Sequence, residues 1–476
     1  MSGLDAVVVG SGPNGLAAAI TLAARGLRVR VIERETVPGG GTRTGEGVAP
    51  GFVFDLCSAV HPMAVASPFF RSVGLQSRVR FVVPDISFGH PLDGGRAVLA
   101  YRDLAATAAA LGADGARYHR LVAPLVAHLD QVSAAALGGI EGALAHPIGA
   151  ALLGARVLEQ GSSLRRLRFR GQEAPALLGG VSAHLTGRLP SPPAAGAGLL
   201  LAAYAHSGGW PLPAAGSRSI ASALAAILAD HGGTVECGRE VTSLAELVAA
   251  TGAKLVLLDV GPAAFAAMAG SRLPDRYRRR IERFRYGNGA CKVDFALREP
   301  VPWLAPALAS AGTVHICGSF GDLAAAEAQV AAGRHSDRPF VLAVQPTPHD
   351  PTRAPAGCHV LSTYAHVPAG STLDMTGAVT NQISRFAPAF RDVVIASEAT
   401  PAADLQLHNP NLVGGDIAGG AMTTRQLLVR PTLGRHPWRT PLPGVYLCSS
   451  STPPGPGVHG MCGNNAARLA LADLGL

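Results

Sequence analysis

The sequence has few aromatic and few charged residues, and it has no apolar run long enough to cross a membrane. Of its 476 residues, 5% are aromatic and 15% are charged, against 48% hydrophobic. A membrane-spanning helix needs about 20 consecutive apolar residues, and the most apolar segment, near 199–204, is far shorter. We therefore expect a folded protein of more than one domain, with little polar surface and an apolar content made mainly of Ala, Leu and Val.

The cysteines form no metal-binding or disulfide framework. There are seven, an odd number, and no two of them make a C-x-x-C pair. We therefore expect no metal site and free thiols, as in a reducing compartment. The first residues lead directly into an apolar segment without the basic and apolar regions of a signal peptide, which predicts a cytoplasmic protein.

The net charge of +8 does not indicate a nucleic-acid-binding protein. The basic residues are dispersed except for two runs, at 165–170 and 276–285. Neither run has the interleaved aromatic residues on which bases stack. We interpret both runs as solvated helix faces, and the alternative is peripheral contact with an anionic membrane surface.

The first 33 residues contain the most informative motif. Residues 1–9 predict a short buried strand, Gly10, Gly12 and Gly15 complete G-x-G-x-x-G, and 16–25 has the composition of a helix. A second strand at 28–32 ends on the acidic residue Glu33. This order predicts a βαβ unit that binds a dinucleotide.

Each residue of this motif has a physical role in the prediction. Gly10 permits a tight turn, Gly12 lets the backbone approach a pyrophosphate, and Gly15 lets the helix pack close to the sheet. The helix N-terminus, which includes Pro13 and Asn14, offers N–H groups and a positive dipole end to phosphates. Glu33 can accept the hydroxyl protons of a ribose.

The rest of the chain leaves this unit and returns to it twice. Between 81 and 193, alanine-rich helical segments alternate with turns. A helix at 219–230 and strands at 234–238 and 254–259 restore the β–α–β rhythm. The chain leaves again for strands at 290–297, 341–344 and 360–366. It ends with a strand at 445–448, a glycine-rich loop, and a helix at 461–474.

Several motifs resemble the phytoene-desaturase-type flavoproteins. They are the opening fingerprint, the turn Gly39-Gly40-Gly41-Thr42-Arg43, the segment 51–55, and the terminal loop 455–461. Within that superfamily, segments 55–62, 286–294 and 414–417 are most similar to the pyridine nucleotide-disulphide oxidoreductase domain 2-like branch. The resemblance covers essentially the whole chain.

The resemblance implies an α/β protein that binds FAD. The expected fold is a discontinuous, glutathione-reductase-like Rossmann FAD domain with an inserted α+β substrate domain. The FAD domain would take residues 1–75, 206–265 and 423–476. The substrate domain would take residues 76–205, which are mainly helical, and 266–422, which form a mixed sheet.

The resemblance also implies which residues bind the cofactor. The residues expected to contact FAD come from five short segments of the chain. They are Gly10, Gly12, Pro13, Asn14, Gly15, Glu33, Arg34, Gly40, Gly41, Thr42, Arg43, Val241, Gly457, Val458, His459, Gly460 and Met461. Val241 would pack on adenine. The 457–460 loop would lie at the isoalloxazine, where the N-terminus of the last helix would stabilise the negative charge of reduced flavin.

One departure from the family pattern affects the substrate prediction. The family often has two glycines where this chain has Ala215-Gly216. A Cβ at Ala215 is expected to narrow the approach to substrate or flavin. A second dinucleotide motif for NAD(P) is absent from the sequence, so we expect electrons to pass to oxygen, a quinone or a partner protein.

His61 and His459 are the candidate acid–base residues. A histidine beside a flavin can move a proton alongside a hydride. The alternative is that each histidine is a packed residue that orients a glycine loop. Cys57 and Cys462 are expected to be structural, and the polar residues of the inserted domain, Tyr204, His206, Tyr364 and His366, are weaker candidates for the substrate pocket.

The sequence therefore predicts an FAD-dependent oxidoreductase that desaturates or oxidises an apolar or amphipathic small molecule. Three alternatives stay open. They are an amine or amino-acid oxidase, a redox-neutral isomerase that uses reduced flavin, and a non-catalytic flavin-bearing interaction protein. The low aromatic content counts against the aromatic cage of an amine oxidase.

Overall fold

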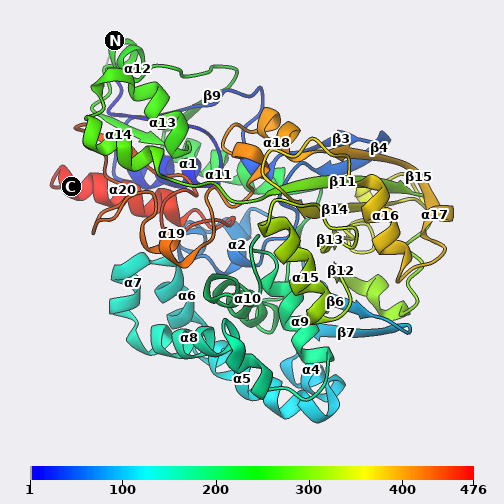
Figure 1. The fold of residues 1–476 in the computed structure, drawn as a ribbon. Coiled ribbons are helices and arrows are strands. Elements are labelled where there is room, and N and C mark those ends of the chain that lie inside the picture. Colours follow the sequence, from blue (N-terminus) through cyan, green and yellow to red (C-terminus); the bar gives the residue numbers. More distant parts are fainter. Residues whose placement is uncertain (1–2) are drawn as a thin grey trace.

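The fingerprint lies at the centre of a five-stranded parallel sheet in the computed structural model, which describes residues 3–476 (Figure 1). All four side chains of the central strand are buried, as expected for a parallel sheet that is covered on both faces. Met1 and Ser2, the start of the predicted first strand, lie outside the described residues. In spatial order the strands are β16 (Val445–Leu447), β10 (Leu255–Leu258), β1 (Ala6–Val9), β2 (Val29–Ile32) and β9 (Thr234–Glu236).

Helices from distant parts of the chain cover the two faces of this sheet. On one face, apolar side chains of three helices pack into one core with β1 and β2. These helices are α1 (Pro13–Ala23), α11 (Arg218–Asp230) and α20 (Met461–Asp473). The opposite face packs against α12 (Leu244–Thr251) and α13 (Pro262–Ala269). The returns to the βαβ unit that the sequence predicted are therefore present.

A second, seven-stranded sheet stands beside the first, at the right of Figure 1. Its strands pair antiparallel except for the parallel pair β12–β6. In spatial order they are β15 (Val394–Thr400), β11 (Gly289–Leu297), β14 (His359–Val367), β13 (Val341–Val344), β12 (Ala311–Ile316), β6 (Ile86–Leu92) and β7 (Arg96–Tyr101). One face packs on α16 (Thr376–Ser384) and α17 (Phe390–Val393).

The hairpin β6–β7 was not predicted, because 81–193 was interpreted as helices and turns. The two strands join through Asp93-Gly94-Gly95, and both glycines have positive φ, 78° and 72°. A D-G-G turn between apolar segments is a hairpin signal. The alanine-rich helices that follow concealed this signal in the composition of the region.

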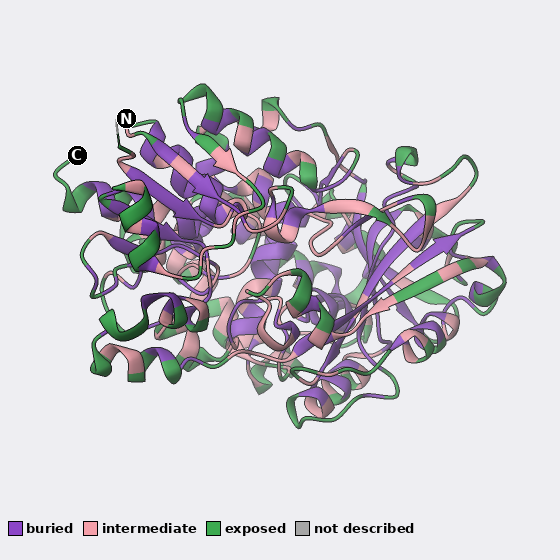
Figure 2. Cartoon of the chain, turned by 90° about the horizontal axis from the view of Figure 1, so that it is seen from above, coloured by how far each residue is buried: buried purple, intermediate pink, exposed green. Residues whose placement is uncertain are grey.

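A layer of helices closes the space between the two sheets. These helices lie at the bottom of Figure 1. Figure 2 shows buried residues on most strands and exposed residues mainly on the outer helices and loops. They are α4 (Leu104–Ala110), α5 (Gly115–Ala127), α6 (Leu129–Leu137), α7 (Gly139–Ala145), α8 (Pro147–Gln160), α9 (Glu173–Ser182) and α10 (Pro192–Ala205). Within residues 3–476, no helix combines the length and the apolar character that a membrane crossing requires.

The predicted α/β class is confirmed, with a Rossmann-like βαβ unit at its centre. The domain boundaries predicted from the sequence, and the assignment of the second sheet to an inserted substrate domain, stay predictions.

Candidate functional site

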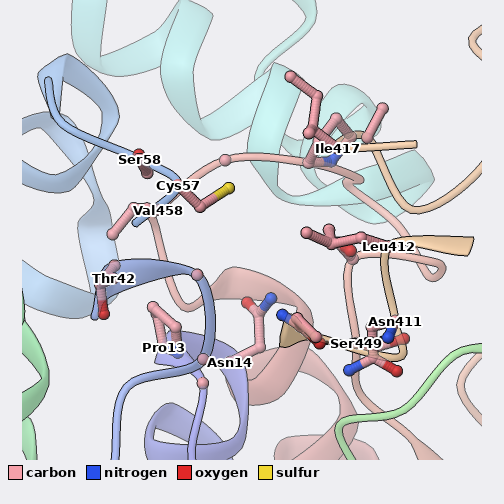
Figure 3. Close-up of a pocket in the computed structure, with 18 of the residues that line it drawn as sticks. Pro13, Asn14, Thr42, Cys57, Ser58, Asn411, Leu412, Ile417, Ser449 and Val458 are labelled. Atoms are coloured by element: carbon pink, nitrogen blue, oxygen red, sulfur yellow. Dashed lines mark hydrogen bonds between the residues drawn. The ribbon is translucent and has the colours of Figure 1, made fainter. Parts of the chain in front are cut away.

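One large cavity begins at the carboxyl ends of the parallel strands, which is where open α/β sheets bind their ligands. Its volume is about 970 Å³. Its walls come from the ends of β1, β2 and β10, from the second sheet, and from α10. Figure 3 shows side chains that are far apart in sequence, among them Asn14, Thr42, Cys57, Asn411 and Val458, around one open space.

The fingerprint glycines are required by close packing. A Cβ at Gly12 would lie 2.7 Å from the Asp259 Oδ2 atom, and a Cβ at Gly15 would overlap the carbonyl oxygen of Gly10. The contact at Gly15 agrees with the tight helix–strand packing predicted for it. The constraint at Gly12 comes from Asp259, and its approach to a pyrophosphate stays a prediction. Gly12 lines the cavity at the N-terminus of α1, together with Pro13 and Asn14.

Glu33 lies at the end of β2 and faces the same cavity. Its Oε2 accepts hydrogen bonds from the Ser11 N–H at 2.8 Å and the Ser11 hydroxyl at 2.6 Å, and its Oε1 accepts from the Glu35 N–H at 2.9 Å. A carboxylate offers about four lone pairs, so Oε1 keeps acceptor capacity. The geometry fits the ribose-binding role predicted for Glu33.

Arg43 ties the glycine-rich turn to another segment of the chain. Its guanidinium pairs with Glu35 at 2.9 Å and donates to the carbonyl oxygens of Gly40 at 3.2 Å and His408 at 2.6 Å. Arg43 lines the cavity, but these partners use most of its donors. Its contact with phosphates stays a prediction, and the structure shows that it holds the turn in place.

The terminal loop reaches the cavity through Gly457 and Val458. Met461 opens helix α20, as predicted, and its N–H donates to the His459 Nδ1 at 3.0 Å. His459 is fully buried, it is not among the cavity-lining residues, and burial lowers its pKa to about 4. This geometry favours the orienting alternative, and a catalytic role for His459 stays a prediction.

His61 faces the cavity but is held by a serine. The Ser217 hydroxyl donates to the Ser58 carbonyl oxygen at 2.7 Å, so it accepts from the His61 Nε2–H, also at 2.7 Å. Burial lowers the pKa of His61 to about 4, so the ring is neutral near pH 7. Its Nδ1 is buried and has no hydrogen-bond partner within residues 3–476. A proton-transfer role for His61 stays a prediction.

Most of the predicted cofactor residues come together at this one cavity. Those that line it are Gly10, Gly12, Pro13, Asn14, Glu33, Arg34, Gly40, Gly41, Thr42, Arg43, Val241, Gly457 and Val458. Gly15, His459, Gly460 and Met461 lie behind the lining.

Asp259 is a site residue that the sequence prediction missed. It follows β10, it lines the cavity, and its Oδ2 accepts the Gly15 N–H at 3.0 Å, which caps the first turn of α1 from a neighbouring strand. Burial raises its pKa to about 7, with the nearby Glu33 acting in the same direction. Its position at the end of a parallel strand was the available signal, because such strands end at the same edge as the fingerprint.

The expectation for Ala215 is wrong. Ala215 is exposed and does not line the cavity, so its Cβ cannot narrow the approach to it. Its backbone has φ of +60°, and its N–H donates to Asp350 at 2.8 Å. The alanine therefore replaces a glycine in a left-handed turn at the surface.

The part of the cavity farthest from the fingerprint, here called the inner chamber, has mainly apolar walls. It lies between α10 and one face of the seven-stranded sheet. Its lining residues include Cys57, His184, Leu200, Leu201, Trp210, Lys292, Thr313, Leu342, Val344 and Tyr364. Of the four weaker candidates for the substrate pocket, Tyr364 reaches the cavity lining, whereas Tyr204, His206 and His366 do not.

The sequence is similar to known proteins both in its first segment and along the whole chain. The NAD(P)-binding Rossmann-like domain family matches residues 8–72. Pyridine nucleotide-disulfide oxidoreductase domain-containing protein 2 of Rattus norvegicus is 27% identical over 559 aligned positions, which cover 99% of this chain and 94% of the relative.

Solved structures share the fold at low sequence identity. An oxidoreductase from Methanosarcina mazei superposes with a TM-score of 0.61 at 16% identity, covering 98% of this chain and 99% of the other. Cyclohexylamine oxidase from Brevibacterium oxydans gives a TM-score of 0.56 at 16% identity, with 100% of both chains covered.

The chain carries a Rossmann-like dinucleotide-binding unit and is similar along its whole length to a protein named as an oxidoreductase domain-containing protein. The predicted resemblance to the pyridine nucleotide-disulphide oxidoreductase domain 2-like branch is confirmed by the full-length similarity to the rat protein.

Proposed function

We propose that this protein is an FAD-dependent oxidoreductase that desaturates or oxidises an apolar or amphipathic small molecule. The observation that carries the proposal is the single cavity, in which a dinucleotide-binding edge continues into a chamber with mainly apolar walls. A cofactor on one side and a substrate on the other would meet inside it.

The residues present fit FAD at several independent points. A Cβ at Gly12 would meet the Asp259 carboxylate, so the start of α1 is restricted to glycine at this position. Glu33 would hold the adenosine ribose, Val241 would pack on adenine, and Gly457 and Val458 would lie at the flavin ring. The expected glutathione-reductase-like arrangement, with an inserted substrate domain, is part of this proposal.

FAD, when bound, supplies a hydride acceptor at N5. The chain itself supplies position and exclusion of water. Among the described residues, the two candidate histidines are neutral and tied into the packing, so no acid–base pair stands out in the lining. This supports a role for the chain in positioning a substrate C–H group beside the flavin, which would accept the hydride, while the proton from the neighbouring carbon would pass to solvent.

An apolar substrate fits the outer surface as well as the chamber. Large apolar side chains are more than half exposed on α7, α8 and the loop after α19 (Thr424–Leu428), namely Ile140, Leu144, Ile148, Leu158 and Leu433. Leu153 and Val157 of α8 and Leu428 of α19 line the cavity. This supports entry of the substrate along an apolar surface and the peripheral membrane contact expected as an alternative. Oxygen or a quinone would re-oxidise the flavin.

The direct test is anaerobic reduction of the flavin. The protein, purified from cells, should carry FAD with an absorption band near that of other oxidised flavins. Its absorption should bleach when an apolar substrate from a metabolite panel is added without oxygen. Bleaching by small primary amines, and by no neutral apolar molecule, would instead select an amine oxidase.

The redox-neutral alternative has its own outcome in the same experiment. Product formed by prereduced protein, without any net oxidation of the flavin, would identify an isomerase. If no member of the panel reduces the flavin and no oxygen is consumed, the protein is a flavin-bearing interaction protein and the proposed function is wrong.

A further inference from the structure

One face of the seven-stranded sheet carries a row of polar residues into the inner chamber. The register pairs Lys292 of β11 with Tyr364 of β14, and Tyr364 with Leu342 of β13. Directly opposed side chains on one face have Cβ atoms about 5 Å apart. All three residues line the cavity, and Lys292 and Tyr364 are direct neighbours across the two strands.

The opposite face of the same strands is apolar, so the polar side chains lie on the face toward the chamber. Val293, Ala343 and Val314 alternate with the row above, and they pack into the apolar core under α16 and α17. The strands therefore alternate between an apolar buried face and a face that carries hydrogen-bonding groups. A sheet face meant only to pack would have no need of a lysine and a tyrosine there.

The polar groups that reach the chamber are mainly donors. The Lys292 ammonium pairs with Asp294, and it makes no other hydrogen bond to the described residues. An ammonium has three donors, so two remain. No hydrogen bond joins the Tyr364 hydroxyl to another of residues 3–476. Burial, with the Cys57 thiol and the Glu327 carboxylate nearby, raises its pKa well above the ordinary value, so it keeps its proton.

The negatively charged groups of the lining lie at the other end of the cavity. Four carboxylates line the cavity, and all of them follow strands of the parallel sheet: Glu33, Glu35, Glu240 and Asp259. In the chamber, His184 faces His315 with 2.8 Å between their Nε2 atoms, and burial lowers the pKa of His184 to about 3. The described lining of the chamber therefore contains no carboxylate, and the two nearest ones, Asp294 and Glu327, lie outside the lining and pair with Lys292 and His366.

We infer that the inner chamber binds an apolar substrate by an oxygen acceptor on that substrate, a ketone, an aldehyde, a hydroxyl or a carboxylate, held by Tyr364 and Lys292. The same arrangement discriminates against amines, because an ammonium would lose its hydration and meet a lysine instead of a carboxylate. This inference rests on the proposed function for the location of the substrate. It concerns recognition, not the oxidation step.

The test measures binding with matched probes on the purified holoprotein. Isothermal titration calorimetry would give the Kd of methyl hexyl ketone, octanoate, octylamine and octane, with quenching of the chamber residue Trp210 as a second readout. We expect the ketone to bind about 3- to 10-fold more tightly than octane, as one neutral hydrogen bond allows. Octylamine should bind more weakly than the ketone.

Variants then separate recognition from simple packing. Tyr364→Phe should remove the preference for the ketone over octane while leaving octane binding unchanged. Lys292→Met is best combined with Asp294→Asn, so that no unpaired buried charge remains, and should weaken octanoate most. Tyr204→Phe is the matched control, because its hydroxyl donates to Ser133 at 3.0 Å and lies outside the cavity lining.

The outcomes for the inference and for the proposed function are distinct. Tighter binding of octylamine than of the ketone, or an unchanged ketone-to-octane ratio in Tyr364→Phe, would overturn the inference even if the flavin is reduced by another substrate. Loss of FAD, or failure of every substrate to reduce it, would overturn the proposed function, while the ratio of the two Kd values would still report on the chamber.

Discussion

The two ends of the cavity are built in different ways. The fingerprint end consists of backbone, glycines and carboxylates, mostly from residues 10–43, with Glu240 and Asp259 added from later in the chain. The inner chamber consists of single side chains from β11, β12, β13 and β14, from α10, and from loops. The first end is fixed by local geometry, and the second by the register of a sheet.

This difference explains why the sequence of the fingerprint end is constrained, whereas the side chains of the chamber can change. A backbone cradle recognises what all dinucleotides share, and any added Cβ damages it. A wall made of side chains can change its chemistry by one substitution without changing the fold. The predictions below probe the fingerprint end and its surroundings, and each would sharpen or break the contrast with the chamber.

The largest effect is expected for Gly15→Ala. The new methyl group would overlap the carbonyl oxygen of Gly10, which is backbone and cannot move aside without shifting β1 or α1. We expect a loss of about 3 kcal/mol in the free energy of unfolding, at the upper end for overpacking, and protein without flavin. Thermal unfolding and the ratio of visible to ultraviolet absorbance measure the two effects.

Gly154→Ala is the matched control for that substitution. Gly154 lies within α8, and a Cβ there would meet no atom within 4 Å. Since alanine is favoured over glycine in a helix by about 1 kcal/mol, this variant should be equal to or more stable than the parent. Equal damage from both substitutions would contradict the special role of the fingerprint glycine.

A smaller effect on the cofactor is expected for Glu33→Gln. The neutral amide weakens hydrogen bonds to a ribose, and hydrogen bonds to charged groups contribute about 1.5–3 kcal/mol. The Kd for FAD should therefore rise about 10- to 100-fold, measured by the fluorescence of released flavin. Glu240→Gln, at another cavity carboxylate, is the comparison, and tight FAD binding after Glu33→Gln would remove Glu33 from the ribose site.

Asp259 should make stability depend on pH. Its pKa is about 7 in the folded protein against 3.8 for an ordinary aspartate. Between these values the folded state keeps a proton that the unfolded state has lost, so stability falls as the pH rises through this window. The free energy of unfolding can fall by about 1.4 kcal/mol for each pH unit in this window.

Asp259→Asn isolates that effect, because the other titrating groups cancel in the difference. The difference in unfolding free energy between parent and variant should change from about pH 4 to pH 7 and stay constant above it. Above about pH 7, where Asp259 of the parent is charged, the variant should lose any weakening of FAD binding that this charge causes beside a diphosphate. A difference that is flat from pH 4 to pH 8 would show that Asp259 titrates normally.

The smallest effect is expected for Ala215→Gly. Relief of the left-handed backbone at φ of +60° is worth about 1–2 kcal/mol, and the extra freedom of glycine in the unfolded chain offsets about 0.5–1 kcal/mol. We expect a net gain of about 0.5 kcal/mol in urea unfolding and an unchanged Kd for FAD, because Ala215 is outside the cavity. A changed flavin affinity would return this residue to the site.

The sequence predicted the fingerprint end well because its signals are local. Gly12, Gly15 and Glu33 are separated by few residues, and their spacing alone implies a strand, a helix and a strand. The strands at 254–259 and 445–448 could also be predicted from their apolar runs, and both are present.

The chamber was beyond such prediction because its residues meet only through strand register. Lys292 and Tyr364 are 72 positions apart (364 − 292), and only the pairing of β11 with β14 shows that they oppose each other. Asp259 was missed because its role depends on a contact between distant segments. Its carboxylate accepts the N–H of Gly15, which lies 244 positions earlier in the chain. The β6–β7 hairpin was hidden by the composition of the helices around it.

The packing of α1 against α20 sets the order in which the site can be made. A Cβ at Gly463 in α20 would overlap the carbonyl oxygen of Asn14 in α1, so the two helices touch at backbone distance. During synthesis, α1 is made first but must wait for about 440 further residues before this partner leaves the ribosome. The packing of α1 on α20 can therefore form only after the end of the chain has been synthesised.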